Sequence, residues 1–312
     1  MMRQAGRYLK EYRDIRSKYP FMTMVKTPEL ATTVTLQPIE RFGFDAAIIF
    51  SDILVVAEAL GGQLEFVEGI GPVFHNPVRA PRDLTHLNPS DIEEKLNYVC
   101  EAIKLTKQSL NGTPLIGFAG APFTVASYMV EGRPSQTLRN MKSAMYDLKP
   151  LLDMITEATI TYLNAQVEAG VDAIQIFDTW AGLLSLEDFM EFSVPYIQRI
   201  ISTIKVPVTV FCKGRHAPKF QDIGANVIGF DWQTDLGEIR QSLRPSVGIQ
   251  GNMDPCLFFA SAEVITRKTN ALVDKMSDRP GYIFNLGHGI LPETDPEKVR
   301  LVVDLVKNAH YR

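Results

Sequence analysis

Seven short apolar runs, each separated from the next by a longer segment, constrain the fold of this 312-residue chain more than any other feature. The runs are continuous rather than alternating in polarity, which is typical of strands covered on both faces in a parallel sheet. Their alternation with longer segments predicts an α/β fold. The runs are Ala46 to Phe50, Pro114 to Phe118, Ala173 to Phe177, Pro207 to Phe211, Val227 to Phe230, Val247 to Gln250 and Tyr282 to Leu286.

The segments between the runs show helical patterns with recognisable ends. Apolar residues recur at helical spacing from Ile92 to Ile103, after a cap at Ser90 or Asp91, and Gly112 follows them. A longer helix is predicted from about Pro150 to Gly170, because glycine readily adopts the left-handed backbone that ends a helix. The chain therefore repeats a strand followed by a helix.

A stub at Met1 to Gln4 adds an eighth strand, and eight such units predict a (β/α)8 TIM barrel with a truncated first strand. We expect residues 1–312 to form a single domain, since neither a linker nor a strong internal repeat interrupts them. An open doubly wound sheet is the alternative, but no G-x-G-x-x-G motif follows an early strand. The stretch from Gly61 to Leu84 is expected to be a long irregular loop.

Composition limits the partners and the compartment. The net charge of −4 argues against a nucleic-acid partner, because such proteins usually present a basic field. The three cysteines, Cys100, Cys212 and Cys256, form no C-x-x-C pair, which fits a reducing compartment better than a disulfide scaffold. No apolar run approaches the roughly 18 residues that cross a bilayer, and no signal peptide is recognisable. We therefore expect a cytoplasmic protein without a membrane partner.

Polar and aromatic side chains follow several predicted strands, where the active site of a TIM barrel lies. They are Asp52, Tyr128, Phe177, Thr179 and His288. Each has an ordinary structural explanation: Asp52 caps the next helix, Tyr128 and Phe177 pack, and Thr179 bonds loop backbone. His288 is harder to explain by packing, because glycines on both sides bury little and allow close approach.

Two further acids, Asp231 and Asp254, also follow predicted strands. For these two we retain the ordinary explanation, in which each carboxylate bonds backbone N–H groups at the start of the next element. They are not candidates for the site.

The first residues of the chain gather several arginines: Arg3, Arg7, Arg13 and Arg16. A solvated basic terminus is the ordinary explanation. However, guanidinium groups donate paired hydrogen bonds in a rigid fork that suits carboxylates and phosphates. On a mildly acidic protein, this local cluster indicates a substrate with several such groups.

Five sequence motifs, spread in order through nearly the whole chain, carry a resemblance to a known family. They are Met2 to Tyr8 (MRQAGRY), Phe50 to Leu54 (FSDIL), Gly117 to Thr124 (GFAGAPFT), Tyr128 to Gly132 (YMVEG) and Phe284 to Ile290 (FNLGHGI). Together they resemble the uroporphyrinogen decarboxylase family, and the first and last motifs are highly specific.

The resemblance implies a (β/α)8 barrel, a homodimer, and removal of the four acetate carboxyls of uroporphyrinogen III to give coproporphyrinogen III, without cofactor or metal. It implies that Asp52 and Arg3 are catalytic: Asp52 accepts the pyrrole N–H groups, and Arg3 donates or organises a proton. The substrate contacts that it implies are Arg3, Gln4, Arg7, Arg16, Asp52, Tyr128, Phe177, Thr179 and His288.

The start of the chain departs from the family pattern. Family members carry a further segment ahead of the Met-Arg-Gln motif, with a helix and most of the first barrel strand. An incomplete strand leaves an open seam with unpaired backbone groups. We therefore expect weakened stability and a poorly anchored Arg3.

Two alternative functions stay open at this stage. The first is a zinc-dependent corrinoid or thiol methyltransferase of the same superfamily, with Cys212 and His288 as ligands. A catalytic zinc normally has three protein ligands, and His216 completes the set only if its loop turns inward. The second is a catalytically impaired tetrapyrrole-binding protein that retains part of the pocket.

Overall fold

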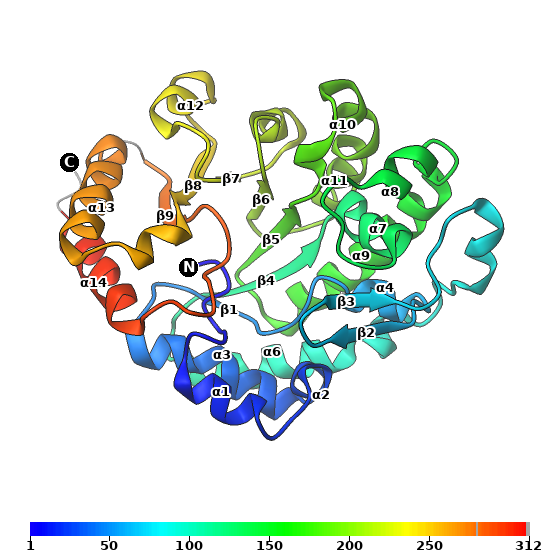
Figure 1. Cartoon of the computed structure of the whole chain (residues 1–312), viewed down its shortest axis with the longest axis horizontal. Coiled ribbons are helices and arrows are strands. Elements are labelled where there is room, and N and C mark those ends of the chain that lie inside the picture. The colour runs from blue at the N-terminus through cyan, green and yellow to red at the C-terminus, as the bar shows by residue number, and fades with distance from the viewer. Residues whose placement is uncertain (279, 310–312) are drawn as a thin grey trace.

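The computed structural model describes residues 1–278 and 280–309, and at its centre lies one curled parallel sheet of seven strands (Figure 1). The strands neighbour one another in the order β1-β4-β5-β6-β7-β8-β9. Their bounds are β1 Ala47–Ile48, β4 Leu115–Gly120, β5 Ala173–Asp178, β6 Val208–Cys212, β7 Val227–Phe230, β8 Gly248–Met253 and β9 Tyr282–Leu286. All seven predicted strands are confirmed. The last residues of the predicted domain, 310–312, lie outside the described part.

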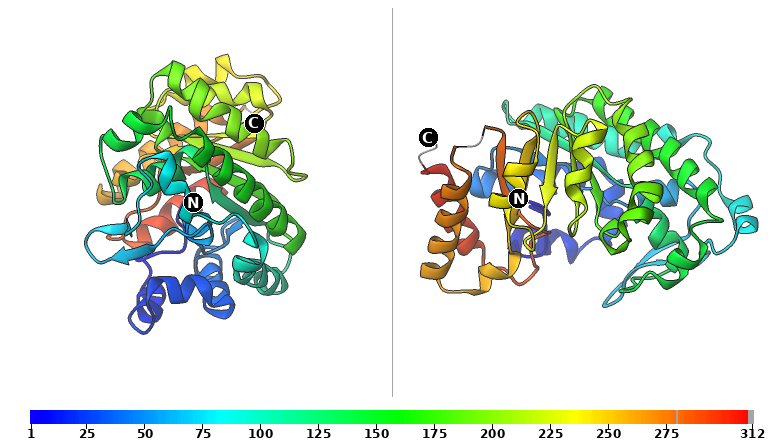
Figure 2. Two further views of the ribbon diagram at one scale, coloured as in Figure 1. Left: turned by 90° about the vertical axis from the view of Figure 1, so that its right-hand side faces the viewer. Right: turned by 90° about the horizontal axis from the view of Figure 1, so that it is seen from above.

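Helices surround the sheet on its outer side (Figures 1 and 2). The α-helices are α1 Lys10–Arg16, α2 Phe21–Lys26, α3 Pro28–Phe42, α4 Val55–Ala59, α5 Ile92–Lys95, α6 Asn97–Ser109, α7 Pro122–Glu131, α8 Arg139–Ala144, α9 Lys149–Ala169, α10 Leu186–Phe192, α11 Val194–Ile201, α12 Leu236–Ser242, α13 Ala262–Met276 and α14 Pro296–Lys307. The 3-10 turns are η1 Pro81–His86, η2 Ala181–Leu183, η3 Ala217–Ile223 and η4 Pro255–Phe259.

The predicted helical segments are present, but the first differs in detail. The pattern from Ile92 to Ile103 forms two helices, α5 and part of α6, which meet at Leu96, and Asp91 at the start makes no side-chain capping bond. The longer helix is α9, and it ends where Gly170 takes a left-handed φ of 112°. Within the described ranges, none of the helices combines the length and the apolar character needed to cross a membrane.

The alternation of side chains along β5 shows how the core is divided. Ile174 and Ile176 are fully buried, and Ile174 lies beside Gln166 of α9, on the helix-facing side of the sheet. Gln175 points to the opposite side, where Gln250 Nε2 donates to its Oε1 at 3.0 Å across the barrel interior. Phe177 follows two residues later on the same interior face. The carboxyl ends of the strands therefore direct Phe177 and its neighbours into the barrel.

The predicted stub strand at Met1 to Gln4 is wrong. Arg3 has a φ of 58°, in the left-handed region, which interrupts the extended backbone that a strand requires. Among the described residues, β1 and β9 are the two edges of the seven-stranded sheet, and no strand joins them. Residues 2–4 lie between these edges, and we call this segment the seam.

Side chains, rather than a backbone ladder, connect the seam to the two edge strands. On the β9 side, the Met2 N–H donates to Asn285 Oδ1 at 2.7 Å. On the β1 side, Gln4 Nε2 donates to the Ala46 carbonyl at 3.2 Å and Gln4 Oε1 accepts from the Ile48 N–H at 3.1 Å. The expectation of a poorly anchored Arg3 is therefore wrong, because both of its neighbours are held.

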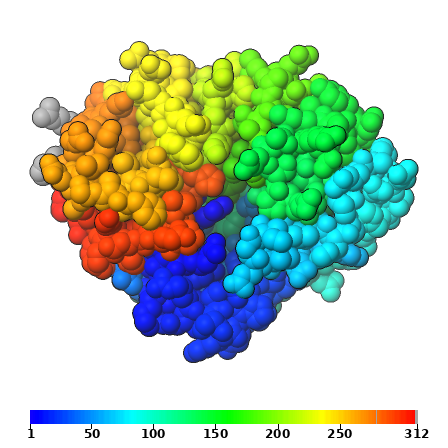
Figure 3. All heavy atoms as spheres, in the orientation of Figure 1, coloured from blue at the N-terminus to red at the C-terminus, as the bar shows by residue number. Residues whose placement is uncertain are grey.

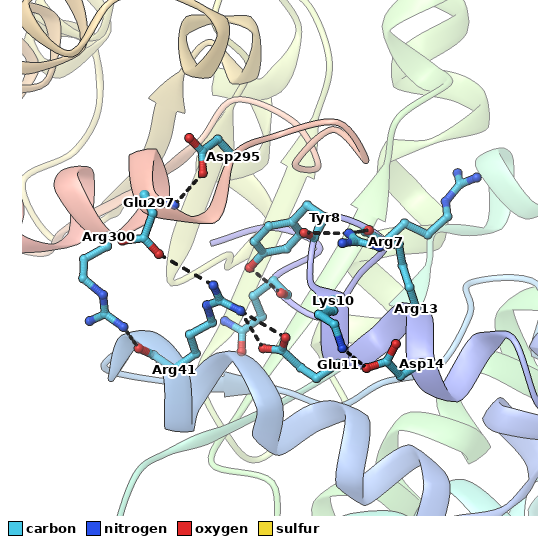
Figure 4. Close-up of polar contacts among 11 residues, drawn as sticks. Arg7, Tyr8, Lys10, Glu11, Arg13, Asp14, Arg41, Asp295, Glu297 and Arg300 are labelled. Atoms are coloured by element: carbon cyan, nitrogen blue, oxygen red, sulfur yellow. Dashed lines mark hydrogen bonds and ion pairs between the residues drawn. The ribbon is translucent and has the colours of Figure 1, made fainter.

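Helices α1, α3 and α14 are tied together outside the seam (Figure 4). Arg41 of α3 pairs with Glu11 of α1 at 3.0 Å and with Glu297 of α14 at 3.6 Å. Arg300 of α14 also donates to the Arg41 carbonyl. Arg41 thus joins the helix that precedes β1 to the helix that follows β9.

The stretch from Gly61 to Leu84 is not irregular throughout, as was expected. It contains an antiparallel hairpin of β2 Leu64–Val67 and β3 Gly71–Phe74. The Phe66 ring lies 4.6 Å from the Phe21 ring of α2. This contact packs the hairpin of β2 and β3 beside α2.

Candidate active site

A hollow opens near the middle of one face of the molecule, beside the first residues of the chain (dark blue in Figure 3). Arg3, in the seam, is exposed. Burial raises the pKa values of Asp52 and Tyr128 and lowers that of His288, and the positive charge of Arg3 acts to lower all three. Arg3 therefore lies within electrostatic range of these residues. The structure therefore brings together four of the predicted residues, from the seam, the β1 and β9 ends and α7.

Asp52 lies four residues beyond the end of β1 and is half-buried. Its Oδ1 accepts the Leu54 N–H at 2.8 Å, which starts the turn into α4. Burial raises its pKa to about 6, although the Leu54 N–H and the charge of Arg3 act in the opposite direction. At neutral pH Asp52 is therefore an ionised carboxylate with part of its surface still open to a donor.

His288 follows β9 and is half-buried among aromatic rings. Its ring centroid lies 6.2 Å from that of Phe211 and 6.3 Å from that of Trp232. Burial, followed by the charges of Arg3 and Lys213, lowers the pKa of His288 to about 4. The imidazole is therefore neutral at neutral pH, with one N–H to donate and one nitrogen to accept.

The two glycines beside His288 both permit close approach, as predicted. A Cβ on Gly287 would lie 2.9 Å from the Asp231 carbonyl carbon, so neighbouring backbone occupies that space. A Cβ on Gly289 would lie 2.6 Å from Arg3 Nε. The seam and the β9 end thus meet at Gly289.

Tyr128, Phe177 and Thr179 come from α7 and from the end of β5. Tyr128 on α7 is half-buried, with its ring edge-on to that of Trp180 at 5.9 Å, and burial raises its pKa. The Phe177 ring lies 6.2 Å from that of Phe211, which in turn contacts His288. Thr179 is half-buried one residue beyond the end of β5. A chain of ring contacts therefore connects the β5 and β9 ends.

The remaining three residues of the predicted set, Gln4, Arg7 and Arg16, have other surroundings. The Gln4 side chain is buried, and both ends of its amide are bonded to β1 backbone. Arg7 and Arg16 are exposed, and their charges both act on the buried Tyr12, whose ring contacts that of Phe50 at 5.9 Å. These two arginines thus lie on the α1 side, near the strand end that leads to Asp52.

Asp178, the last residue of β5, was not among the residues predicted for the site. This carboxylate is fully buried, accepts Thr124 Oγ1 at 2.7 Å and Ser193 Oγ at 2.5 Å, and has a pKa that burial raises to about 6. Thr124 Oγ1 also accepts the Trp180 N–H at 3.1 Å. The signal was available: Asp178 continues the helix-facing register of Ile176, where a carboxylate requires hydroxyl or N–H donors.

Asp254 bonds the backbone at the start of the next element, as expected, whereas Asp231 does so only in part. Asp231 is fully buried. Its Oδ1 accepts the Gln233 N–H at 3.2 Å and its Oδ2 accepts the Gly214 N–H at 2.8 Å from the loop after β6, while Asp235 caps the next helix, α12. Asp254 accepts the Cys256 N–H at 2.8 Å at the start of η4.

The three ligands of the zinc alternative do not come together. The Cys212 thiol is buried and donates to the Lys213 carbonyl at 3.3 Å. His216 Nε2 lies 3.0 Å from the Leu184 carbonyl. In the part of the chain that the structure describes, no group of three or more His, Cys, Asp or Glu side chains is placed to hold a metal ion.

These features define an α/β-barrel protein whose candidate site joins one half-buried carboxylate, one arginine and one neutral histidine at the strand ends. The family model for uroporphyrinogen decarboxylase matches residues 1–309. The chain belongs to the uroporphyrinogen decarboxylase family.

Individual relatives agree with this assignment. The chain is 45% identical to the uroporphyrinogen decarboxylase of Alkalilimnicola ehrlichii, over 98% of this chain and 88% of that protein. It is 46% identical to that of Geobacter metallireducens, over 98% and 92%. Among solved structures, a methyltransferase from Methanosarcina mazei shares the fold with a TM-score of 0.78 and 23% identity, over 92% of this chain and 89% of that one.

Proposed function

We propose that the chain decarboxylates uroporphyrinogen III, converting its four acetate side chains to methyl groups and giving coproporphyrinogen III in tetrapyrrole biosynthesis. The observation that carries the proposal is a half-buried Asp52 within electrostatic range of Arg3, in a chain of this family. A substrate rich in carboxylates suits a chain in which the exposed Arg7 and Arg16 lie near the strand end that leads to Asp52.

The chemistry requires no organic cofactor, because the substrate provides its own electron sink. Protonation of a ring carbon of the electron-rich pyrrole creates a cation. The electrons of the bond to the acetate carboxyl then flow into the ring, and loss of CO2 leaves an exocyclic methylene. A second proton converts this methylene to the methyl group, and the ring carbon releases the first proton, which restores the aromatic pyrrole and leaves a net uptake of one proton per CO2. Asp52, ionised at neutral pH, accepts the pyrrole N–H groups and stabilises the developing positive charge.

Arg3 holds the reacting carboxylate and orients the proton donor. A guanidinium with a pKa above about 12 is a poor general acid, so a water molecule or a substrate carboxyl held by Arg3 delivers the proton. Tyr128, Thr179 and His288 donate hydrogen bonds to the remaining carboxylates, and Phe177 forms an apolar wall. Gln4 does not contact the substrate, because both ends of its amide are hydrogen-bonded to the β1 segment; it holds the backbone next to Arg3.

The test is an anaerobic incubation of the purified chain with uroporphyrinogen III, with and without a chelator, and separation of the products by carboxyl number. A tetracarboxylate product in both arms is expected. Loss of the product with chelator, restored by zinc, would show that the decarboxylation needs a metal and would contradict the metal-free reaction. Substrate binding without any product would favour the impaired tetrapyrrole-binding protein.

We further propose that residues 1–312 fold as a single domain and act as a homodimer in the cytoplasm, without a nucleic-acid partner. The family resemblance and the net charge of −4 support this. Leu186 and Met190 expose apolar surface on α10, which a second copy could cover. Sedimentation equilibrium should give twice the chain mass, and thermal unfolding should show one transition.

A further inference from the structure

We propose that Gly289 is a positioning residue, whose missing side chain leaves the space through which Arg3 reaches the site. The inference deepens the proposed function and rests on it for its kinetic consequence. It concerns a residue with no side chain of its own to contact substrate, acting through the side chain of Arg3.

The contact at Gly289 is specific to one side chain. The three nearest atoms that a Cβ at this position would meet all belong to Arg3, among them Cγ at 2.7 Å and Nε at 2.6 Å. These distances are well below ordinary van der Waals contact, so the arginine would have to move. The φ of Gly289 lies outside the left-handed region, so alanine there meets no backbone penalty.

The backbone of Arg3 cannot easily make room. On one side, the Met2 N–H is bonded to Asn285 and the Met2 carbonyl accepts the Ile290 N–H at 3.1 Å. On the other side, Gln4 is bonded at both ends of its amide to β1. A methyl group at position 289 would therefore displace the Arg3 side chain rather than the seam.

The neighbouring glycine provides a contrast. At Gly287 a Cβ would meet backbone, with the Asp231 carbonyl carbon at 2.9 Å and Trp232 Cα at 3.1 Å. Substitution there disturbs the packing of β9 against the β7 end. Of the two glycines that flank His288, Gly287 allows close packing against the backbone of Asp231 and Trp232, and Gly289 leaves space for the Arg3 side chain.

Displacement of Arg3 has a chemical consequence. Its charge reaches Asp52, Tyr128 and His288, so its place decides how a substrate carboxylate is held among them. Misplacement of a catalytic group by about 1 Å can cost roughly 100-fold in rate. Gly289→Ala should therefore act on kcat/KM through Arg3, with little effect on folding.

The experiment is a double-mutant cycle of Gly289→Ala and Arg3→Ala, measured by kcat/KM and melting temperature. Gly6→Ala is the matched control, since a Cβ there lies 3.4 Å from the Arg3 carbonyl oxygen, an ordinary contact. We expect Gly289→Ala to melt like the wild type and to lose roughly 10- to 100-fold in kcat/KM. In the Arg3→Ala background it should cause no further loss. Wild-type kcat/KM in Gly289→Ala, or losses that simply add, would overturn the proposal.

A readout independent of turnover separates this proposal from the proposed function. The charge of Arg3 holds down the pKa of His288, so Arg3→Ala should raise it, as followed by NMR of the imidazole protons. Gly289→Ala should raise it as well, and the double variant should match Arg3→Ala. If the wild type does not decarboxylate uroporphyrinogen, the function fails while this pattern still tests the positioning role. An unchanged His288 pKa in Gly289→Ala would contradict it.

Discussion

The ladder from β4 to β9 and the seam between β9 and β1 hold the barrel together in different ways. Each neighbouring pair in the ladder is joined over three to five residue pairs of parallel backbone. The seam is instead held by single contacts, through the side chains of Asn285 and Gln4 and through the Ile290 N–H, which donates to the Met2 carbonyl. Within the ladder the loss of one hydrogen bond is shared among many, whereas each seam contact acts alone.

The difference matters because the seam carries Arg3. Its backbone is held in a left-handed conformation between Met2 and Gln4, and its side chain reaches the site across Gly289. The ladder supplies the strand ends that hold His288 and Phe177. Substitution of residues that hold the seam should therefore lower activity more than stability. Substitution of residues that hold the ladder should lower stability more than activity.

Two glutamines make this comparison precise in chemical terms. Gln4 bonds both a carbonyl and an N–H of the β1 segment. Gln166 of α9 does the same on β4, with Nε2 donating to the Phe118 carbonyl and Oε1 accepting the Phe118 N–H, both at 3.0 Å. The side chains are used identically, but only Gln4 adjoins a proposed catalytic residue.

Removing the Arg3 side chain should have the largest effect in this series. Arg3→Ala is expected to lower kcat/KM by about 100- to 1,000-fold, as for loss of one preorganised electrostatic contact. Because the side chain is exposed, the melting temperature should stay near that of the wild type. Lys10→Ala is the control, since Lys10 is exposed and pairs with Asp14 on the surface. Equal activity in the two variants would contradict the role of Arg3.

The matched variants Gln4→Leu and Gln166→Leu test the comparison itself. Each leaves a backbone carbonyl and N–H unpaired, which costs about 1–3 kcal/mol of stability. Only Gln4→Leu should also lower kcat/KM, by roughly tenfold, because it frees the backbone beside Arg3. Denaturant unfolding and steady-state kinetics check the two effects. If both variants lose activity equally, the seam has no special role.

Protonation of Asp52 should change kcat/KM by an amount between the effects of the preceding variants and those of Arg7 and Arg16. Burial raises the pKa of Asp52 to about 6, so kcat/KM should fall as the pH drops through that value and the carboxylate is protonated. His288, with a pKa of about 4, stays neutral in that range. The charge of Arg3 lowers the pKa of Asp52, so the acidic limb of Arg3→Ala should move to higher pH. An acidic limb that does not move would contradict this coupling.

The raised pKa of Asp52 also determines how the stability of the folded chain changes with pH. Asp52 binds its proton more tightly in the folded chain than at the ordinary value of 3.8. Its contribution to stability is therefore complete below about 3.8 and is lost as the pH rises through about 6. The stability of the wild type relative to Asp52→Asn should fall over that interval, as followed by thermal melts.

Substitution of the two exposed arginines, Arg7 just before α1 and Arg16 at its end, should have the smallest effects on activity. Arg7→Ala and Arg16→Ala remove charges that solvent and salt already screen. We expect KM to rise a few-fold with kcat unchanged, and the rise to shrink at higher ionic strength. A fall in kcat as large as that of Arg3→Ala would place these side chains at the reacting group instead.

Much of the fold could be predicted because its signals are local. Continuous apolar runs marked all seven strands, and Gly170 marked the end of α9. The contacts that place Arg3 could not be predicted, because they join residues more than 40 and 280 positions apart in the chain. The glycines beside His288 indicated close approach, but not which group would approach.

The errors have equally physical causes. The left-handed backbone at Arg3 breaks the predicted stub strand, and nothing in the local sequence requires a positive φ at an arginine. Asp178 was missed because only its register on β5, and not its residue type, places it toward the helices.

The measurement that tests the central claim most directly is anaerobic turnover of uroporphyrinogen III by Asp52→Asn beside the wild type. Asp254→Asn is the matched control, since that strand-end carboxylate bonds the backbone of η4. The account predicts that Asp52→Asn loses about 100- to 1,000-fold in turnover while still binding substrate, and that Asp254→Asn turns over normally. Unchanged turnover in Asp52→Asn would contradict the role of this carboxylate and with it the mechanism.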